Sequence, residues 1–365
     1  MRNFFFRFRH LDITLEVTCF LLLLIGLSLI YSTSLNGDRS SFLKQAVYAL
    51  IAVVLFFFFA FFDLSKLSKI GRYLYLFLVA ALVLVLFAGH SVQGSSRWFN
   101  LKFISFQPAE FAKLVIILVL ARFFALRRGE INIWKNVLLS FVYVLIPIFL
   151  IAKEPDLGSA LVILIIWLGM LFLSNVNKKI FIYIFLIFSV VSIGSWKFVL
   201  KDYQKNRIMT FVNPQLDPRG KGYNVQQAII SVGSGKVLGT GLGRGLQSQL
   251  KFLPERQTDF VFASAAEELG LLGSAVIIIL YFLLLYRFLA IYAKSRDDLD
   301  RFIVAGVFFL ILSQAVINIG MNIGLLPVTG IPLPFISYGG SSLITVAIGA
   351  GVVEAVAVRS KGLRL

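Results

Sequence analysis

The residue best placed for chemistry is Asp259, which stands where a polar stretch meets an apolar one. Residues 200–258 form the one long polar segment of the chain, glycine-rich and basic, and a long apolar run begins directly after the aspartate. A carboxylate at such a boundary can accept a proton from a bound hydroxyl group, as a general base does. Asp259 is therefore the first candidate for a catalytic residue.

Other ionisable residues stand at the ends of apolar runs, where burial is costly and normally marks a site or a partner. Glu110 and Lys113 are three residues apart, which places them on one face of a helix as a pair that either locks helix packing or belongs to a site. Glu154 and Asp156 precede another apolar run, where they either cap a helix or face a cavity. Arg97 is suited to a phosphate group, while its neighbour Trp98 is equally typical of a membrane-interface anchor.

Glu267 and Glu268 follow Asp259 along the same apolar run, about 12 Å deeper at a rise of ~1.5 Å per residue. Acidic residues that belong to three different apolar runs are therefore expected at one level of the membrane. This favours a shared cavity over three independent helix caps.

The composition indicates an integral membrane protein, because 59% hydrophobic residues and a mean hydropathy of +0.89 exceed what a soluble core of this size holds. The first run matches the thickness of a bilayer and lacks a small-residue cleavage site, so it is expected to be a retained span. We predict an all-α polytopic protein with one membrane domain over residues 1–365. The expected spans lie near 13–33, 43–62, 73–88, 107–126, 137–152, 157–174, 180–199, 260–290, 302–322 and 335–357.

The basic residues between these runs predict the orientation. Short basic segments near 2–9, 66–72, 127–135, 178–179, 294–301 and 359–364 alternate with the other loops. By the positive-inside rule they are cytoplasmic, which puts both termini inside and Asp259 outside. The outer loops are expected near 34–42, 89–106, 153–156, 200–258 and 323–334, the fourth being the largest.

The net charge of +17 follows partly from these cytoplasmic loops, so nucleic acid need not be invoked. The outer segment 200–258 nevertheless holds nine basic and three acidic residues, a balance of +6 that suits anionic headgroups or a pyrophosphate. Its glycines match neither nucleotide-binding pattern, and tight turns are favoured over an anion-binding nest. One cysteine and two histidines exclude disulfides and a Cys/His zinc site, so any metal would need carboxylate ligands.

Several motifs together resemble the SEDS family of RodA, FtsW and SpoVE. The resemblance covers nearly the whole chain and is most specific in the last two segments, of which QSQLKFLPE and LLPVTGIPLP are most similar to RodA, the elongation member. The segments are 94–113, 154–158, 203–204, 207–208, 222–223, LPERQTDFVFASAAEELG (253–270) and NIGMNIGLLPVTGIPLPFISYGGSS (318–342).

The resemblance implies a peptidoglycan glycosyltransferase that polymerises lipid II into β-1,4 glycan strands on the outer face of the bacterial cytoplasmic membrane. It also implies a class B penicillin-binding protein as transpeptidase partner. Asp259 falls on the essential aspartate of the family. Substrate-binding or cavity positions are implied for Arg97, Trp98, Glu110, Lys113, Asp156, Arg207, Gln227 and Lys251.

The chain departs from the family pattern at Glu154, at Gln257, which replaces a histidine, and at Lys251, which replaces an acidic residue. These changes leave the ligand set of any metal open, with Mg²⁺ or Mn²⁺ as candidate cofactors. Three other interpretations remain: a flippase for lipid-linked oligosaccharides, a division paralogue like FtsW, and a scaffold without enzymatic activity. A flippase would share the helices and the intramembrane charges, but would have no catalytic use for Asp259.

Overall fold

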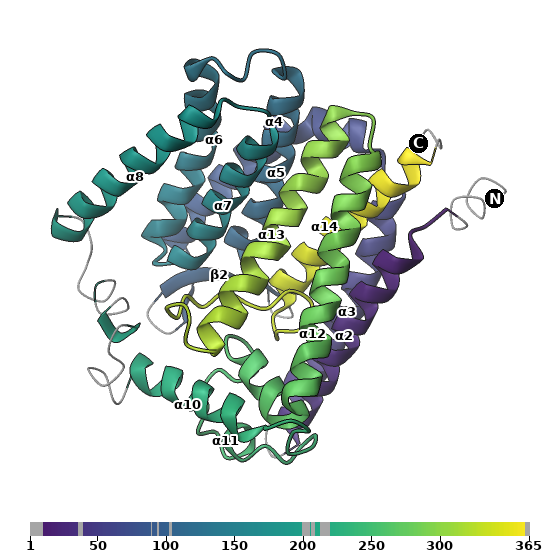
Figure 1. Ribbon diagram of the computed structural model, residues 1–365, viewed down its shortest axis with the longest axis vertical. Coiled ribbons are helices and arrows are strands. Elements are labelled where there is room, and N and C mark those ends of the chain that lie inside the picture. The colour runs from purple at the N-terminus through teal and green to yellow at the C-terminus, as the bar shows by residue number, and fades with distance from the viewer. Residues whose placement is uncertain are drawn as a thin grey trace.

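The computed structural model shows a bundle of long helices with a small sheet and two short helices packed at one end (Figure 1). It describes residues 10–35, 39–88, 90–92, 95–101, 104–198, 205, 209–211 and 220–361. We call the end that carries α10 and α11, at the bottom of Figure 1, the Asp259 end, and the other the opposite end.

A helix coincides with every apolar run that the sequence predicts as a span. Within the described residues, seven helices are long and apolar enough to cross a membrane: α2, α3, most of α4, α6, α12, α13 and α14. The crossing of α5, α7 and α8 stays a prediction. The bounds are α2 Ile13–Ser34, α3 Ser40–Ala60, α4 Leu64–Ala88, α5 Pro108–Leu126, α6 Trp134–Lys153, α7 Leu157–Leu173, α8 Lys178–Phe198, α10 Lys221–Ser234, α11 Leu246–Gln249, α12 Val261–Lys294, α13 Asp298–Asn322 and α14 Gly340–Ser360.

The centre of the bundle is formed by α13 and α14. The most apolar stretch of α14 is 94% buried and that of α13 is 72% buried, whereas the other candidate spans reach at most 44%. Helix α14 packs closely against α3. The small residues of α14 make this possible, since lipid-embedded helices associate through close backbone contact. At Gly351 a β-carbon would lie 2.4 Å from the carbonyl oxygen of Phe56 on α3.

A three-stranded antiparallel sheet occupies the segment between α4 and α5, which the all-α prediction treated as a loop. Its strands are β1 His90–Val92, β2 Ser95–Leu101 and β3 Ile104–Phe106, in the order β1-β2-β3. The segment is too short for a helix pair, and the ladder pairs backbone groups that would otherwise need water. Phe106 stacks on Phe111 at a centroid distance of 4.7 Å, which fixes the sheet to the start of α5.

At the opposite end of the bundle, a hydrogen-bond network connects the start of α2 with α12 and α14. Asp12 caps α2 by accepting the N–H of Leu15 at 3.3 Å, and Arg287 on α12 donates from Nε to both carboxylate oxygens of Asp12 at 2.7 and 2.8 Å. The N–H of Asp12 donates to Glu354 on α14 at 2.6 Å. The start of α2 is thereby held against α12 and α14.

Helix α12 is interrupted at Gly270, where φ is +69° and ψ is −166°. In a continuous helix the carbonyls of Glu267 and Glu268 would accept from the N–H groups of Leu271 and Leu272, four residues on. The glycine breaks this part of the ladder. Four backbone groups near the Asp259 end are thus released and need other partners.

Segment 236–241 supplies all four partners. The N–H groups of Thr240 and Gly241 donate to the two released carbonyls, each at 3.0 Å. The carbonyls of Lys236 and Val237 accept from the two released N–H groups at 2.9 and 3.2 Å. The part of the polar segment that links α10 to α11 is therefore attached to α12 through the backbone.

The glycines of this segment serve that attachment. Gly239 has a φ of +79°, and a β-carbon there would lie 2.2 Å from the carbonyl oxygen of Glu268. Gly235 is equally close, with a β-carbon 1.9 Å from the carbonyl oxygen of Ala266. Within the described residues, the glycine-rich stretch forms turns that dock on a helix, as the favoured interpretation of the sequence predicts.

We expect Gly239→Ala to weaken the docking of segment 236–241 on α12. The left-handed backbone costs an alanine about 1–2 kcal/mol, and the methyl group collides with the Glu268 carbonyl. Hydrogen exchange at the amides of Leu271 and Leu272 should become faster. Gly233→Ala is the matched control, because Gly233 is helical with no heavy atom within 4 Å of its β-carbon position, and unchanged exchange in both variants would contradict the docking role.

Candidate active site

Asp259 lies in the last turn before α12, at the helix boundary that the sequence predicts. It is half-buried, and its Oδ2 atom lies 3.5 Å from the position that a β-carbon of Gly330 would occupy. Gly330 itself has a φ of +76°, which favours glycine. The carboxylate therefore lies next to a residue that has no side chain, and a β-carbon at that position would be in van der Waals contact with it.

Two asparagines of α13 hold the backbone of Asp259. Asn318 and Asn322 are fully buried one turn apart, and their Nδ2 groups donate to the carbonyl oxygen of Asp259 at 2.9 and 3.0 Å. Asn322 Oδ1 accepts the N–H of Ala263 at 2.9 Å, which caps the first turn of α12. Asn318 also donates to the carbonyl of Ile331 at 2.8 Å. The position of the aspartate is thus set by α13.

The residues just before Asp259 are fixed from two further sides. Ser337 Oγ donates to the carbonyl of Thr258 at 2.6 Å, and the N–H of Tyr338 donates to the carbonyl of Gln257 at 2.7 Å. The side-chain Nε2 of Gln257 donates to Thr33 Oγ1 on α2 at 3.1 Å. Gln257, which replaces the histidine of the family pattern, therefore ties this turn to α2.

Asp156 is a buried helix cap. It accepts the N–H of Ser159 at 3.1 Å and the Ser159 hydroxyl at 3.0 Å, so its carboxylate satisfies the first turn of α7. Gln107 donates to it from Nε2 at 3.2 Å and from its own N–H to Ser341 Oγ at 3.1 Å. The cap interpretation is the one observed, and a contact of Asp156 with substrate stays a prediction.

The turn at residues 329–331 lies against Gly158, two residues after Asp156, and against Asp259. A β-carbon at Gly158, in the first turn of α7, would lie 2.9 Å from the carbonyl oxygen of Thr329 and 2.9 Å from a side-chain carbon of Ile331. The middle residue of this turn, Gly330, is the one beside Asp259. The starts of α7 and α12 are therefore brought to one place by a single turn.

Glu110 and Lys113 form an ion pair, as their spacing predicts. Lys113 Nζ lies 2.5 Å from Glu110 Oε1, and Lys113 is 0% exposed. The second carboxylate oxygen of Glu110, Oε2, has no hydrogen-bond partner among the described residues. A charge pair at this depth makes the two side chains strongly interdependent, since either one alone would be an uncompensated buried charge.

Glu267 and Glu268 are both buried, and each accepts hydrogen bonds from another part of the chain. Glu267 accepts the N–H groups of Gln247 and Ser248 at 2.8 and 3.0 Å, at the start of α11. Glu268 accepts from Ser32 Oγ on α2 at 2.6 Å. These carboxylates attach α11 and α2 to α12, because a buried carboxylate needs donors and these groups supply them.

Arg256 is a half-buried cation three residues before Asp259. Its Nη2 donates to the carbonyl of Thr33 at 3.1 Å, and its Nε has no hydrogen-bond partner in the described part of the chain. Burial lowers the pKa of Arg256, while the Glu268 carboxylate acts in the opposite direction. In the sequence Arg256 counts only as one basic residue of the outer segment.

The remaining predicted site residues are placed only in part. Trp98 is half-buried on β2, opposite His90 in the register. Arg97 precedes it on the same strand, and its side chain lies outside the described part. Arg207 falls wholly outside the described residues.

The two predicted residues of the polar segment lie in different settings. Gln227 is half-buried on α10, next to Ala228, which packs with Phe260 in a small hydrophobic cluster. Gln227 is therefore carried by a helix that packs beside the site. Lys251 is exposed after α11 with a φ of +62°, and its contact with substrate stays a prediction.

The described residues bring together no three His, Cys, Asp or Glu side chains suited to hold a metal ion. Apart from Asp259, the acidic residues described above have structural partners: Asp156 caps α7, Glu110 pairs with Lys113, and Glu267 and Glu268 bind α11 and α2. Mg²⁺ or Mn²⁺ as a cofactor stays a prediction, since Mg²⁺ often needs only one or two carboxylates together with substrate phosphates.

The fold and this site define a polytopic helical membrane protein with a fixed carboxylate at one end of the bundle. The chain belongs to the family of FtsW, RodA and SpoVE, whose model, described as cell cycle protein, matches residues 10–362.

Among its relatives is the peptidoglycan glycosyltransferase MrdB of Escherichia coli strain K12, which is 35% identical over 355 residues, or 97% of this chain and 95% of MrdB. A chain of a peptidoglycan synthase complex, solved to show the coordination of polymerization and crosslinking, matches with a TM-score of 0.84. It is 30% identical and covers 96% of this chain and 98% of its own. The crystal structure of the rod shape determining protein RodA of Thermus thermophilus matches with a TM-score of 0.71 at 28% identity, over 95% and 96% of the two chains.

We expect Asn318→Asp and Asn322→Asp each to destabilise the protein by about 1–3 kcal/mol, because each exchange removes a donor and places a carboxylate against a buried carbonyl. Thermal unfolding in detergent measures the change. Asn175→Asp, at an exposed turn after α7, is the matched control. Equal melting temperatures for all three variants would contradict the anchoring role of the two asparagines.

Proposed function

We propose that this chain is a peptidoglycan glycosyltransferase that polymerises lipid II. The family of the chain and the activity in the name of its E. coli relative support the proposal. The observation that carries it is the placement of Asp259, a half-buried carboxylate whose backbone is held by Asn318 and Asn322 and whose side chain lies next to Gly330. A group held in this way is preorganised to accept a proton.

In the proposed reaction, the 4-hydroxyl of a GlcNAc residue attacks the anomeric carbon of a lipid-linked MurNAc. The new bond is β-1,4, the bond to undecaprenyl pyrophosphate breaks, and the configuration at the anomeric carbon inverts. Asp259 takes the hydroxyl proton, since the hydroxyl alone is a weak nucleophile. The leaving pyrophosphate carries away the electron pair, and it needs no dedicated acid because its pKa is low.

Cationic residues would stabilise the charge that develops on the pyrophosphate. Arg97 and Arg207 are candidates by their positions in the sequence. Lys113 was a third candidate, but its Nζ is buried and paired with Glu110. This geometry favours a role for Lys113 in helix packing over direct contact with phosphate.

The site faces the outside of the cell in this proposal. The basic connections among the described residues, near 66–72, 127–135, 178–179 and 294–301, lie at the opposite end of the bundle (Figure 1), which by the positive-inside rule is cytoplasmic. With α5, α7 and α8 also crossing, ten spans place both termini in the cytoplasm. Asp259 then meets lipid II at the outer leaflet, where the glycan strand is built.

The proposed partner is a class B penicillin-binding protein acting as the transpeptidase. Its support is the match to a chain of a complex that coordinates polymerization with crosslinking. The segments QSQLKFLPE and LLPVTGIPLP, together with the match to the Thermus protein described as rod shape determining, favour a role in elongation over division.

We expect Asp259→Asn to lower the rate of lipid II polymerisation by roughly 10²–10⁴-fold, because an amide cannot accept the proton. The measurement is glycan chain formation from purified lipid II by protein in detergent, with and without the transpeptidase partner. Glu130→Gln, an exposed carboxyl-to-amide exchange at the opposite end, should retain the normal rate.

The same assay, together with a lipid II transport assay, separates the enzyme from a flippase. If the wild-type protein formed no glycan with its partner present, but moved lipid II across vesicle membranes, the transporter interpretation would replace this one. Normal polymerisation by Asp259→Asn would instead remove the aspartate from the mechanism.

The ion pair of Glu110 and Lys113 can be tested against its two interpretations. We expect Glu110→Leu alone to destabilise the protein by about 3–5 kcal/mol, because it leaves a buried ammonium group unpaired. The double change Glu110→Leu and Lys113→Met should restore the melting temperature. If the pair only locks helix packing, polymerisation recovers as well, whereas a stable but inactive double variant would show that substrate needs Lys113.

A further inference from the structure

A basic cavity lies at the opposite end of the bundle, away from Asp259. It occupies about 530 Å³ between α4, α5 and α6. The described residues that line it include four cationic side chains and no carboxylate: Lys69, Arg72, Arg122 and Arg127. These side chains give the cavity a positive potential, which attracts an anion.

The floor of the cavity is a fixed group of aromatic rings. Tyr75 on α4 donates from its hydroxyl to the carbonyl of Tyr143 on α6 at 3.0 Å, and the two rings meet edge to face at 5.7 Å. Phe123 on α5 packs on Tyr143 at 5.9 Å. The guanidinium of Arg127 lies 4.4 Å above the Phe123 ring, a cation-π contact that holds its charge at the cavity.

The cavity opens toward the lipid at the level where headgroups lie. The apolar stretch of α4 that is long enough to cross a membrane begins at Lys69. Tyr73 and Leu126 both line the cavity, and they are 72% and 73% exposed. Phe77, one turn further along α4, is 70% exposed. An apolar, lipid-facing surface therefore continues directly from the basic cavity.

We propose that this cavity binds the phosphate headgroup of an anionic phospholipid of the cytoplasmic leaflet. Lys69 and Arg72, three residues apart on α4, contact the phosphate from one side, and Arg127 contacts it from the end of α5. The acyl chains lie along the exposed residues of α4. The ligand joins α4 to α5 by neutralising the charges of both helices, as lipid headgroups do in basic pockets between membrane helices.

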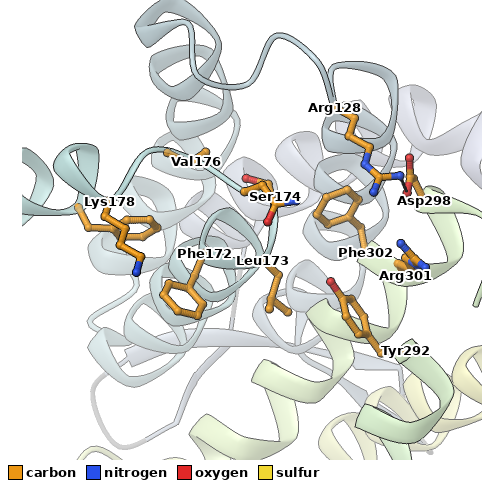
Figure 2. Close-up of a pocket in the computed structure, with 12 residues that line it drawn as sticks. Arg128, Phe172, Leu173, Ser174, Val176, Lys178, Tyr292, Asp298, Arg301 and Phe302 are labelled. Carbon is orange, nitrogen blue, oxygen red and sulfur yellow. Dashed lines mark hydrogen bonds and ion pairs between the residues drawn. The ribbon is translucent and has the colours of Figure 1, made fainter. Parts of the chain in front are cut away.

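A second cavity at the same end lacks this charge pattern. It occupies about 430 Å³ among α7, α8, α12, α13 and the turn after α5, and it also contains basic residues. Figure 2 shows Asp298 beside Arg128, and the two form an ion pair. Arg301 donates from Nε to the carbonyl of Ser295 at 2.7 Å. A carboxylate thus lines this second cavity, whereas the described lining of the cavity at α4 includes none, and the α4 cavity is therefore the better site for an anionic headgroup.

The experiment compares retained lipid by native mass spectrometry. Wild-type protein in detergent is titrated with phosphatidylglycerol and, separately, with phosphatidylcholine. The proposal predicts one phosphatidylglycerol that binds more tightly than phosphatidylcholine. In the triple variant Lys69→Gln, Arg72→Gln and Arg127→Gln, this lipid should bind more than about 100-fold more weakly, because each of the three lost charges weakens binding about fivefold.

The matched control is Lys179→Gln, Lys294→Gln and Arg296→Gln, three exposed basic residues at the same end that do not line the cavity. It should retain the lipid. A charge-preserving variant, Arg72→Lys with Arg127→Lys, should bind nearly as well as the wild type, which separates loss of charge from misfolding.

Equal weakening in the control triple would reduce the site to general surface attraction and overturn the proposal. Unchanged binding in the cavity triple would also overturn it. A final arm adds soluble glycerol phosphate: if it displaces the lipid at equal concentration, the cavity is a site for free phosphate and the lipid assignment is wrong. Polymerisation is not the readout, so failure here leaves the proposed role of Asp259 untouched.

Discussion

The need to pair every backbone polar group within a membrane shapes the Asp259 end of this protein. Lipid offers no hydrogen bonds, so a helix that is interrupted must find partners in the protein itself. Gly270 interrupts α12, and segment 236–241 takes up the four released groups. The break therefore attaches the polar segment to the helix that begins just after Asp259.

Side-chain hydrogen bonds extend this arrangement across the bundle. Asn318 and Asn322 connect α13 to the start of α12, and Gln107 connects α5 to the cap of α7 and to α14. Apolar packing gives little directional preference between lipid-embedded helices, while small residues and polar contacts do. The ends of several helices are thus held at fixed positions around one turn, Thr329–Ile331.

The site combines a fixed backbone with a half-buried carboxylate. The backbone of Asp259 is held on one side by α13, while the side chain lies beside a glycine with no side chain of its own. A proton acceptor is most effective when its position is set before substrate arrives. At the opposite end, the basic cavity between α4 and α5 lies at the lipid boundary, so the chemistry and the proposed lipid contact are at different ends of the bundle.

The sequence by itself determined the helical membrane class, the family and the position of Asp259 at a helix boundary, because apolar run length and specific motifs are local properties of the chain. It also predicted the pairing of Glu110 with Lys113, since their spacing on one helix suffices. It missed the small sheet, the anchoring role of Asn318 and Asn322, and the use of Glu267 and Glu268 to attach α11 and α2. Only the tertiary structure decided these, because hydrogen bonds between residues distant in sequence depend on which helix faces meet, and period and composition leave that open.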